Sequence, residues 1–120
     1  MTLVSEYADL LHNGKLHFVQ PDLGRVGGIT GGLAIEKLAK ETGARAVPHA
    51  FGTGVLLAAS AQWAAASEQP LTEYTRAPSP LAQKLAQHEM TFRNGVLHLT
   101  DQPGLGVDLD EDMVTKFRVM

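Results

Sequence analysis

Short apolar segments alternate with longer helix-forming segments along residues 3–74, and this alternation limits the fold more than any other feature. Helices are expected at residues 3–11, 30–42 and 52–66, and strands at 16–19, 44–47 and 71–74. Thr30 is expected to cap the second helix. Strands that alternate with helices of this length favour parallel β/α units. Because a complete β/α barrel needs roughly 200 residues or more, a chain of 120 residues predicts an α/β fold that is only part of a barrel.

The C-terminal part of the chain does not continue this alternation. Asn94–Gly95 lies between two apolar runs and predicts a β-hairpin over residues 90–99, because both turn residues need a positive φ. Asp108 and Glu111 together favour the start of a helix. The other elements expected here are a short helix at 81–88, a loop at 103–106 and a last helix that ends at Phe117.

Charge and composition exclude several classes of partner. The formal net charge is −3 and no run of lysine or arginine occurs, so neither nucleic acid nor an anionic membrane is expected to bind. The chain has no cysteine, which excludes disulfides, cysteine-based zinc sites and thiol nucleophiles. The longest apolar stretches are shorter than a bilayer span, and the N-terminus has no apolar signal core. We therefore expect a cytoplasmic protein.

Three polar side chains lie at the ends of successive predicted strands. Asp22 follows Pro21, His49 follows Pro48, and Glu73 lies near the end of the third expected strand. In a parallel barrel these ends meet at one mouth, where the active site lies. A carboxylate beside an imidazole fixes the ring's tautomer and favours its charged form, as general acid-base catalysis requires. The other interpretation is that Pro-Asp and Pro-His are ordinary turn chemistry and that Glu73 is a solvated surface charge.

The segments around these residues resemble a known family. They read QPDLGRVGGIT over residues 20–30, VPHAFGTG over 47–54, TEY over 72–74 and PGLGV over 103–107. Their order and spacing are similar to those of the mandelate racemase subgroup, within the mandelate racemase/muconate lactonizing enzyme family of the enolase superfamily. The resemblance implies that His49 is the general acid-base and that Asp22, 27 positions earlier, is its orienting carboxylate. It further implies that Glu73 hydrogen-bonds the enolate oxygen and that Arg25 tunes the pair or contacts substrate.

The resemblance also implies a metal that this chain does not hold by itself. Family members bind Mg²⁺ through three carboxylates on the third, fourth and fifth barrel strands, and these would precede residue 1. No metal ligand is therefore expected in this chain, and Mg²⁺ is expected only in the parent enzyme. His49 alone could not remove a proton next to a carboxylate at a useful rate, because nothing would stabilise the negative charge that develops.

Two functions remain open at this stage. In the first, residues 1–88 are the last three units of an enolase-type barrel, and residues 89–120 pack on an absent N-terminal capping domain. The parent enzyme would abstract a proton α to a carboxylate in a small-molecule carboxylate or acid sugar, as a dehydratase, cycloisomerase or racemase. In the second, the chain is a truncated, non-catalytic fragment or an interaction module that lacks the metal site. Exposed barrel edges favour a homo-oligomer or other association in both cases.

Other motifs carry less weight. Gly52-Thr53-Gly54 faintly resembles a dinucleotide-binding fingerprint, but Leu57 occupies the place of the third glycine. Phe51 and Trp63 are expected to be core residues rather than ligand platforms. The remaining histidines show no metal-ligand spacing.

Overall fold

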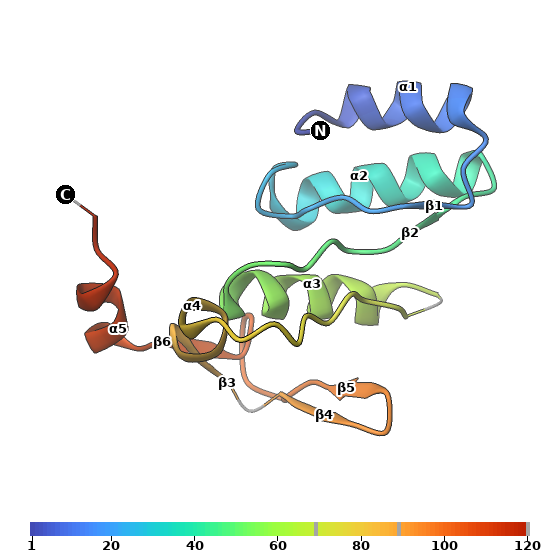
Figure 1. Ribbon diagram of the computed structural model, residues 1–120. Coiled ribbons are helices and arrows are strands. Elements are labelled where there is room, and N and C mark those ends of the chain that lie inside the picture. The colour runs from blue at the N-terminus through green and yellow to red at the C-terminus, as the bar shows by residue number, and fades with distance from the viewer. Residues whose placement is uncertain (69, 89, 120) are drawn as a thin grey trace.

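Two short parallel strands lie at the centre of the first half of the chain. The structure is a computed structural model that describes residues 1–68, 70–88 and 90–119. β1 (Phe18–Val19) pairs in parallel with β2 (Arg45–Ala46), with Val19 opposite Ala46. The helices are α1 (Val4–Gly14) before β1, α2 (Gly28–Glu41) between the strands and α3 (Gly54–Ala66) after β2. The first two predicted β/α units are therefore present, and α2 lies between α1 and α3 (Figure 1).

The main core joins these three helices to β1. Apolar residues spaced four apart place one face of each helix inward, as Tyr7 and Leu11 do on α1 and Ile35 and Ala39 do on α2. The buried residues of this core are Tyr7, Leu11, Val19, Leu23, Val26, Ile35, Ala39, Ala44 and Trp63. Two of them, Leu23 and Val26, belong to the loop that follows β1. The loop that carries Asp22 is thus anchored by its own apolar side chains.

Two glycines let α2 approach this loop closely. A Cβ atom on Gly31 would lie 1.8 Å from the carbonyl oxygen of Val26. A Cβ atom on Gly32 would lie 2.6 Å from a methyl carbon of Leu23. Neither separation is possible between real atoms, so larger residues at these positions would push α2 and the loop apart.

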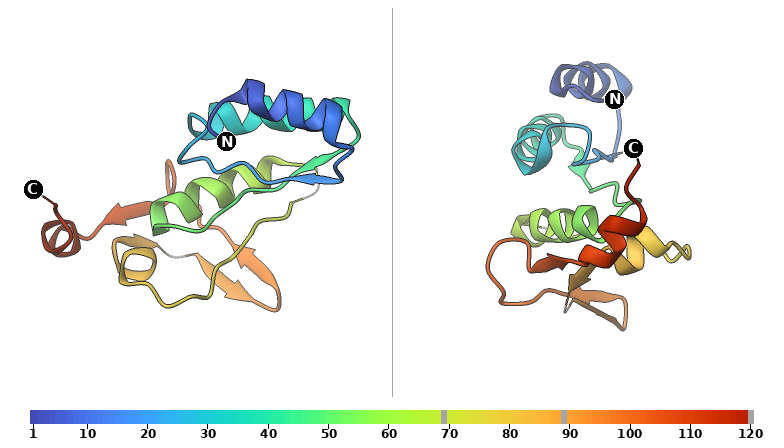
Figure 2. Two further views of the ribbon diagram at one scale, coloured as in Figure 1. Left: turned by 45° about the horizontal axis from the view of Figure 1, so that its top comes forward. Right: turned by 90° about the vertical axis from the view of Figure 1, so that its left-hand side faces the viewer.

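Helix α3 is apolar nearly all round, and protein covers it on two sides. Trp63 faces the main core, where only 3% of its surface is exposed. Ala58 and Ala61 instead pack with Met90 in a second buried cluster. Leu97, Leu99, Leu105 and Val107 lie partly buried against that cluster. The C-terminal segment therefore covers the side of α3 that α2 leaves open (Figure 2).

The C-terminal part forms two small antiparallel sheets. Its elements are α4 (Pro80–Lys84), β3 (Ala86–His88), β4 (Thr91–Arg93), β5 (Val96–His98), β6 (Val107–Leu109) and α5 (Glu111–Lys116). β4 and β5 form the predicted hairpin, and Asn94 and Gly95 have φ values of 51° and 80°. β3 pairs with β6, a long-range pairing that the sequence pattern did not predict.

Several expected element boundaries were wrong. Residues 71–74 form no strand, so the third expected strand is an irregular segment. The expected helix at 81–88 ends at Lys84, and its last three residues form β3. Thr30 does not cap α2, because Gly27 takes that place with a φ of 89° and the helix begins at Gly28. Asp110 rather than Asp108 caps α5, and its side chain accepts the backbone N–H of Met113.

Burial confirms one of the two expected aromatic core residues. Trp63 is buried, whereas Phe51, in the loop between β2 and α3, is 60% exposed. Position 89, at the expected boundary between the two parts of the chain, lies outside the described residues. Within the described ranges, none of the helices has the length and apolar character needed to cross a bilayer.

Candidate functional site

Asp22 is held at the end of β1 by backbone hydrogen bonds. Its Oδ1 atom accepts the N–H of Gly24 at 2.8 Å, which closes an Asx turn. Its main-chain carbonyl accepts the N–H groups of Arg25 and Val26. The carboxylate side chain is only 12% exposed. Asp22 is therefore a largely buried carboxylate whose orientation the following turn fixes.

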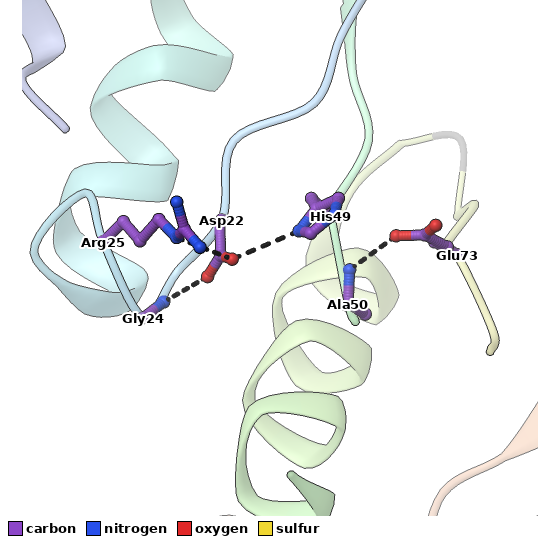
Figure 3. Close-up of polar contacts among 6 residues, drawn as sticks. All are labelled: Asp22, Gly24, Arg25, His49, Ala50 and Glu73. Carbon is purple, nitrogen blue, oxygen red and sulfur yellow. Dashed lines mark hydrogen bonds and ion pairs between the residues drawn. The ribbon is translucent and has the colours of Figure 1, made fainter. Parts of the chain in front are cut away.

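His49 lies next to Asp22 because the extensions of β1 and β2 remain paired. The backbone N–H of His49 donates to the carbonyl oxygen of Pro21 at 3.0 Å. The Nδ1 atom of its ring then lies 3.1 Å from Oδ2 of Asp22 (Figure 3). The His49 side chain is 41% exposed. The contact expected between these two strand-end residues is present.

This contact determines which ring nitrogen is available for chemistry. An ionised carboxylate can only accept hydrogen bonds, so Nδ1 of His49 must carry the proton that Asp22 accepts. The Nε2 atom then holds the lone pair of the neutral ring. Among the residues that the structure describes, Nε2 has no hydrogen-bond partner. His49 can therefore take or give a proton at Nε2 while Asp22 holds the ring.

Arg25 contacts the same carboxylate from the solvent side. Its Nε atom lies 3.5 Å from Oδ2 of Asp22, the oxygen that also contacts His49. The Arg25 side chain is 68% exposed, so water screens this ion pair and it contributes little to stability. Its position allows it to share the charge of Asp22 with His49.

Glu73 reaches the site from the irregular segment after α3. Its Oε2 atom accepts the backbone N–H of Ala50 at 2.9 Å (Figure 3). The next residue, Tyr74, stacks on Phe92 of β4 with ring centroids 4.7 Å apart. Glu73 thus lies beside the His49–Ala50 backbone and is bound to it, without a described hydrogen bond to the His49 ring.

The pKa of Tyr7, on α1, is affected by the charge of Asp22. Burial raises the pKa of the Tyr7 hydroxyl, and the negative charge of Asp22 raises it further. The sequence pattern places Tyr7 in the helix expected at residues 3–11 and does not indicate that it lies near the site. It also missed the backbone donors of Gly24 and Ala50, although Asp-x-Gly at a strand end is a recognisable Asx-turn signal.

The described part of the chain offers no candidate metal site. Within residues 1–68, 70–88 and 90–119, no three histidine, aspartate or glutamate side chains are grouped so that they could hold a metal ion. Asp22, the most buried carboxylate of the candidate site, is already bound to His49, Arg25 and Gly24.

Comparison with protein families gives a match over nearly the whole chain. Residues 1–113 match the family described as enolase C-terminal domain-like. The D-galactarolactone cycloisomerase of Agrobacterium fabrum is 36% identical over 118 residues, which cover 91% of this chain and 31% of that protein. The L-talarate/galactarate dehydratase of Salmonella typhimurium is 33% identical over 111 residues, which cover 92% of this chain and 26% of that protein.

Solved structures give the same result. The 3,6-anhydro-D-galactonate cycloisomerase from Zobellia galactanivorans superposes with a TM-score of 0.89 at 30% identity, over 96% of this chain and 33% of that one. A mandelate racemase/muconate lactonizing enzyme from Jannaschia superposes with a TM-score of 0.87 at 31% identity, over 100% of this chain and 31% of that one. The chain therefore spans about a third of the length of the proteins it matches.

Proposed function

The chain belongs to the enolase C-terminal domain-like family, and from this premise we propose that it is the acid-base part of an enzyme that abstracts a proton α to a carboxylate. The substrate class we propose is acid sugars, and the reaction is a dehydration, cycloisomerisation or racemisation. The names of the relatives support this choice, since they include a D-galactarolactone cycloisomerase and an L-talarate/galactarate dehydratase.

One observation carries the proposal. The Nδ1 atom of His49 lies 3.1 Å from Oδ2 of Asp22, and the ring's other nitrogen has no hydrogen-bond partner among the described residues. This is the arrangement that a general acid-base histidine requires, because the carboxylate sets the tautomer and stabilises the ring when it takes a proton. A turn residue with no catalytic role would not need a carboxylate to orient its ring.

Each of the four residues has a distinct proposed role. His49 removes or delivers the proton at the carbon next to the carboxylate. Asp22 orients the ring through Nδ1, and Arg25 shares the charge of Asp22. Glu73 donates a hydrogen bond to the enolate oxygen from a protonated Oε1, since an ionised carboxylate could only accept and Oε2 already accepts the N–H of Ala50.

The fold that we propose for this function is the last part of a larger barrel. Residues 1–88 would supply the last part of a (β/α) barrel, with β1 and β2 as strands six and seven and the irregular segment 71–74 at the place of strand eight. Residues 89–120 would pack on an N-terminal capping domain. The parallel pairing of β1 with β2 and the position of both polar residues at one end of these strands support this arrangement. We propose a cytoplasmic enzyme, associated through barrel edges that this chain alone leaves exposed.

Members of the enolase superfamily generally use Mg²⁺, which stabilises the negative charge that develops on the substrate carboxylate. The residues described here do not form such a site. In our proposal the metal ligands belong to the part of the enzyme that the chain does not span.

A chimera tests this function with the missing part supplied. Residues 1–113 of this chain would replace the equivalent last third of the A. fabrum D-galactarolactone cycloisomerase, to which they are similar along their length. We refer to this protein below as the chimera. We expect it to fold, to bind Mg²⁺ and to turn over at least one member of a panel of aldonates, aldarates and their lactones. A folded, Mg²⁺-binding chimera that exchanges no α-proton with solvent would contradict the proposal.

A further inference from the structure

The two edges of the backbone around His49 have different hydrogen-bond partners. Three alternate residues of β2 and its extension donate N–H groups to the β1 side: Arg45 to His17, Val47 to Val19 and His49 to Pro21. Alternate residues of a strand direct their N–H groups to opposite edges. The backbone nitrogens of Ala46, Pro48 and Ala50 therefore lie on the edge away from β1. Proline has no N–H, which leaves Ala50 as the donor beside His49 on that second edge.

This donor is buried and needs a partner. Ala50 is only 1% exposed, so water does not satisfy its N–H. The neighbouring segment, residues 70–76, forms no strand and offers no ladder carbonyl there. The Oε2 atom of Glu73 takes the place of that carbonyl, at 2.9 Å from the Ala50 nitrogen. A side chain thus completes the hydrogen bonding that a third strand would ordinarily supply.

The segment that carries Glu73 also contacts strand β4. The ring of Tyr74 stacks on Phe92 with an angle of 9° between the ring planes. Glu73 therefore extends from a backbone that is anchored to β4, and its carboxylate reaches toward the His49–Ala50 peptide (Figure 3). The His49–Ala50 backbone is bound on one edge by Pro21 and on the other by Glu73.

We propose that Glu73 is a positioning residue for His49, acting through the backbone N–H of Ala50. It holds the peptide that follows His49 so that the ring stays against Asp22. The inference rests on the proposed function only for the catalytic purpose of His49. The positioning itself is measured without turnover, so a failure of the positioning and a failure of the proposed reaction are distinguishable.

The first test uses the unmodified chain labelled with ¹⁵N and ¹³C. A long-range NMR experiment detects coupling across the hydrogen bond between the Ala50 nitrogen and the side-chain carboxyl carbon of Glu73. We expect that cross-peak, together with slow hydrogen exchange at the Ala50 amide. If the cross-peak is absent and the amide exchanges as fast as an exposed one, the proposal is overturned.

The second test compares variants that do and do not accept this hydrogen bond. Glu73→Gln keeps an acceptor oxygen at the same reach and should preserve both the slow exchange and the single tautomer of the His49 ring. Glu73→Met removes the acceptor and should speed Ala50 exchange about tenfold or more. It should also give a mixture of His49 tautomers in ¹⁵N spectra of the ring. Glu73→Asp, whose shorter side chain cannot reach, serves the same purpose if Glu73→Met does not fold.

Glu68→Met is the matched control, because it removes the same negative charge and adds the same apolar side chain at another position. Glu68 is exposed, and its ion pair among the residues that the structure describes is with Lys40. This variant should leave Ala50 exchange and the His49 tautomer unchanged. If Glu73→Met and Glu73→Asp fold and behave like Glu68→Met, or if Glu73→Gln does not restore the His49 tautomer, Glu73 does not position His49.

Discussion

The Nδ1 atom of His49 lies 3.1 Å from Oδ2 of Asp22, although the two residues are 27 positions apart in the sequence. Two backbone features produce this contact. The hydrogen bond from the His49 N–H to the Pro21 carbonyl continues the parallel pairing past both strands, and the Asx turn at Gly24 directs the carboxylate. The contact between the two side chains therefore depends on hydrogen bonds from the backbone N–H groups of His49 and Gly24.

Replacing Asp22 by Asn should change the tautomer of the His49 ring. With Asp22 ionised, the neutral ring carries its proton on Nδ1, because the carboxylate can only accept. An amide can present its NH₂ group to Nδ1 instead, which would move the ring proton to Nε2. Ring ¹⁵N shifts of the 120-residue chain measure the two forms.

Asp9→Asn is the control for this experiment, since Asp9 is exposed and its carboxylate accepts a hydrogen bond from the side chain of Asn13. It should leave the His49 ring shifts as they are. A ring that carries its proton on Nε2 in the unmodified chain would show that Asp22 does not orient it.

Replacing Gly31 by Ala should destabilise the chain although Ala is the better helix former. The helix preference favours Ala by about 0.5–1 kcal/mol. The new Cβ would lie 1.8 Å from the Val26 carbonyl oxygen, and relieving such an overlap costs about 1–3 kcal/mol. The clash should dominate, so the free energy of unfolding measured in urea should fall.

Gly14→Ala supplies the comparison, because the atoms nearest to its Cβ would belong to the side chains of Leu16 and Leu10, at 3.3 Å or more. We expect a change below about 1 kcal/mol for that variant. Equal losses in the two variants would mean that α2 does not pack against the Asp22 loop as closely as described.

Acid should loosen the last helix through Asp110. Hydrogen bonds from the Met113 N–H and then from the Gln87 side chain lower the pKa of the Asp110 carboxyl. A lowered pKa stabilises the folded form above the ordinary aspartate range, near about pH 4, and this contribution is lost as pH falls through the lowered pKa. Hydrogen exchange at Met113 should therefore accelerate below about pH 4 beyond its intrinsic pH dependence.

Asp110→Asn should remove this dependence while keeping the cap, since asparagine also accepts at this position. The Met113 amide of that variant should retain its protection at low pH. Acid-induced loosening that persists in Asp110→Asn would assign the effect to another group.

Local patterns predicted the contact between Asp22 and His49 better than they predicted the segments around it. The helices and the first two strands follow from apolar spacing, and the contact of Asp22 with His49 follows from their places after neighbouring parallel strands. The third expected strand has strand-forming residues but forms no strand, and Glu73 bonds to the Ala50 backbone through its side chain instead. Apolar spacing does not show how a neighbouring segment pairs.

The other errors have the same origin. The pairing of β3 with β6 joins residues about 20 apart, and three-residue strands carry too little pattern to reveal it. Thr30 is expected as the cap of α2 because threonine is a common cap, but Gly27, with a φ of 89°, takes that place and the helix begins at Gly28. The roles of His49, Asp22, Glu73 and Arg25 in catalysis remain predictions.

The most direct test of the proposed function is the rate of solvent deuterium incorporation by the chimera with and without His49. We expect His49→Asn to lower exchange at the carbon next to the substrate carboxylate by roughly 10²- to 10⁴-fold, the usual contribution of a general acid-base. Substrate binding should change little, and His98→Asn, in the exposed hairpin strand β5, should behave like the parent chimera. If the chimera with His49→Asn kept near-normal exchange and turnover, His49 could not be the acid-base, and the mechanism would be wrong.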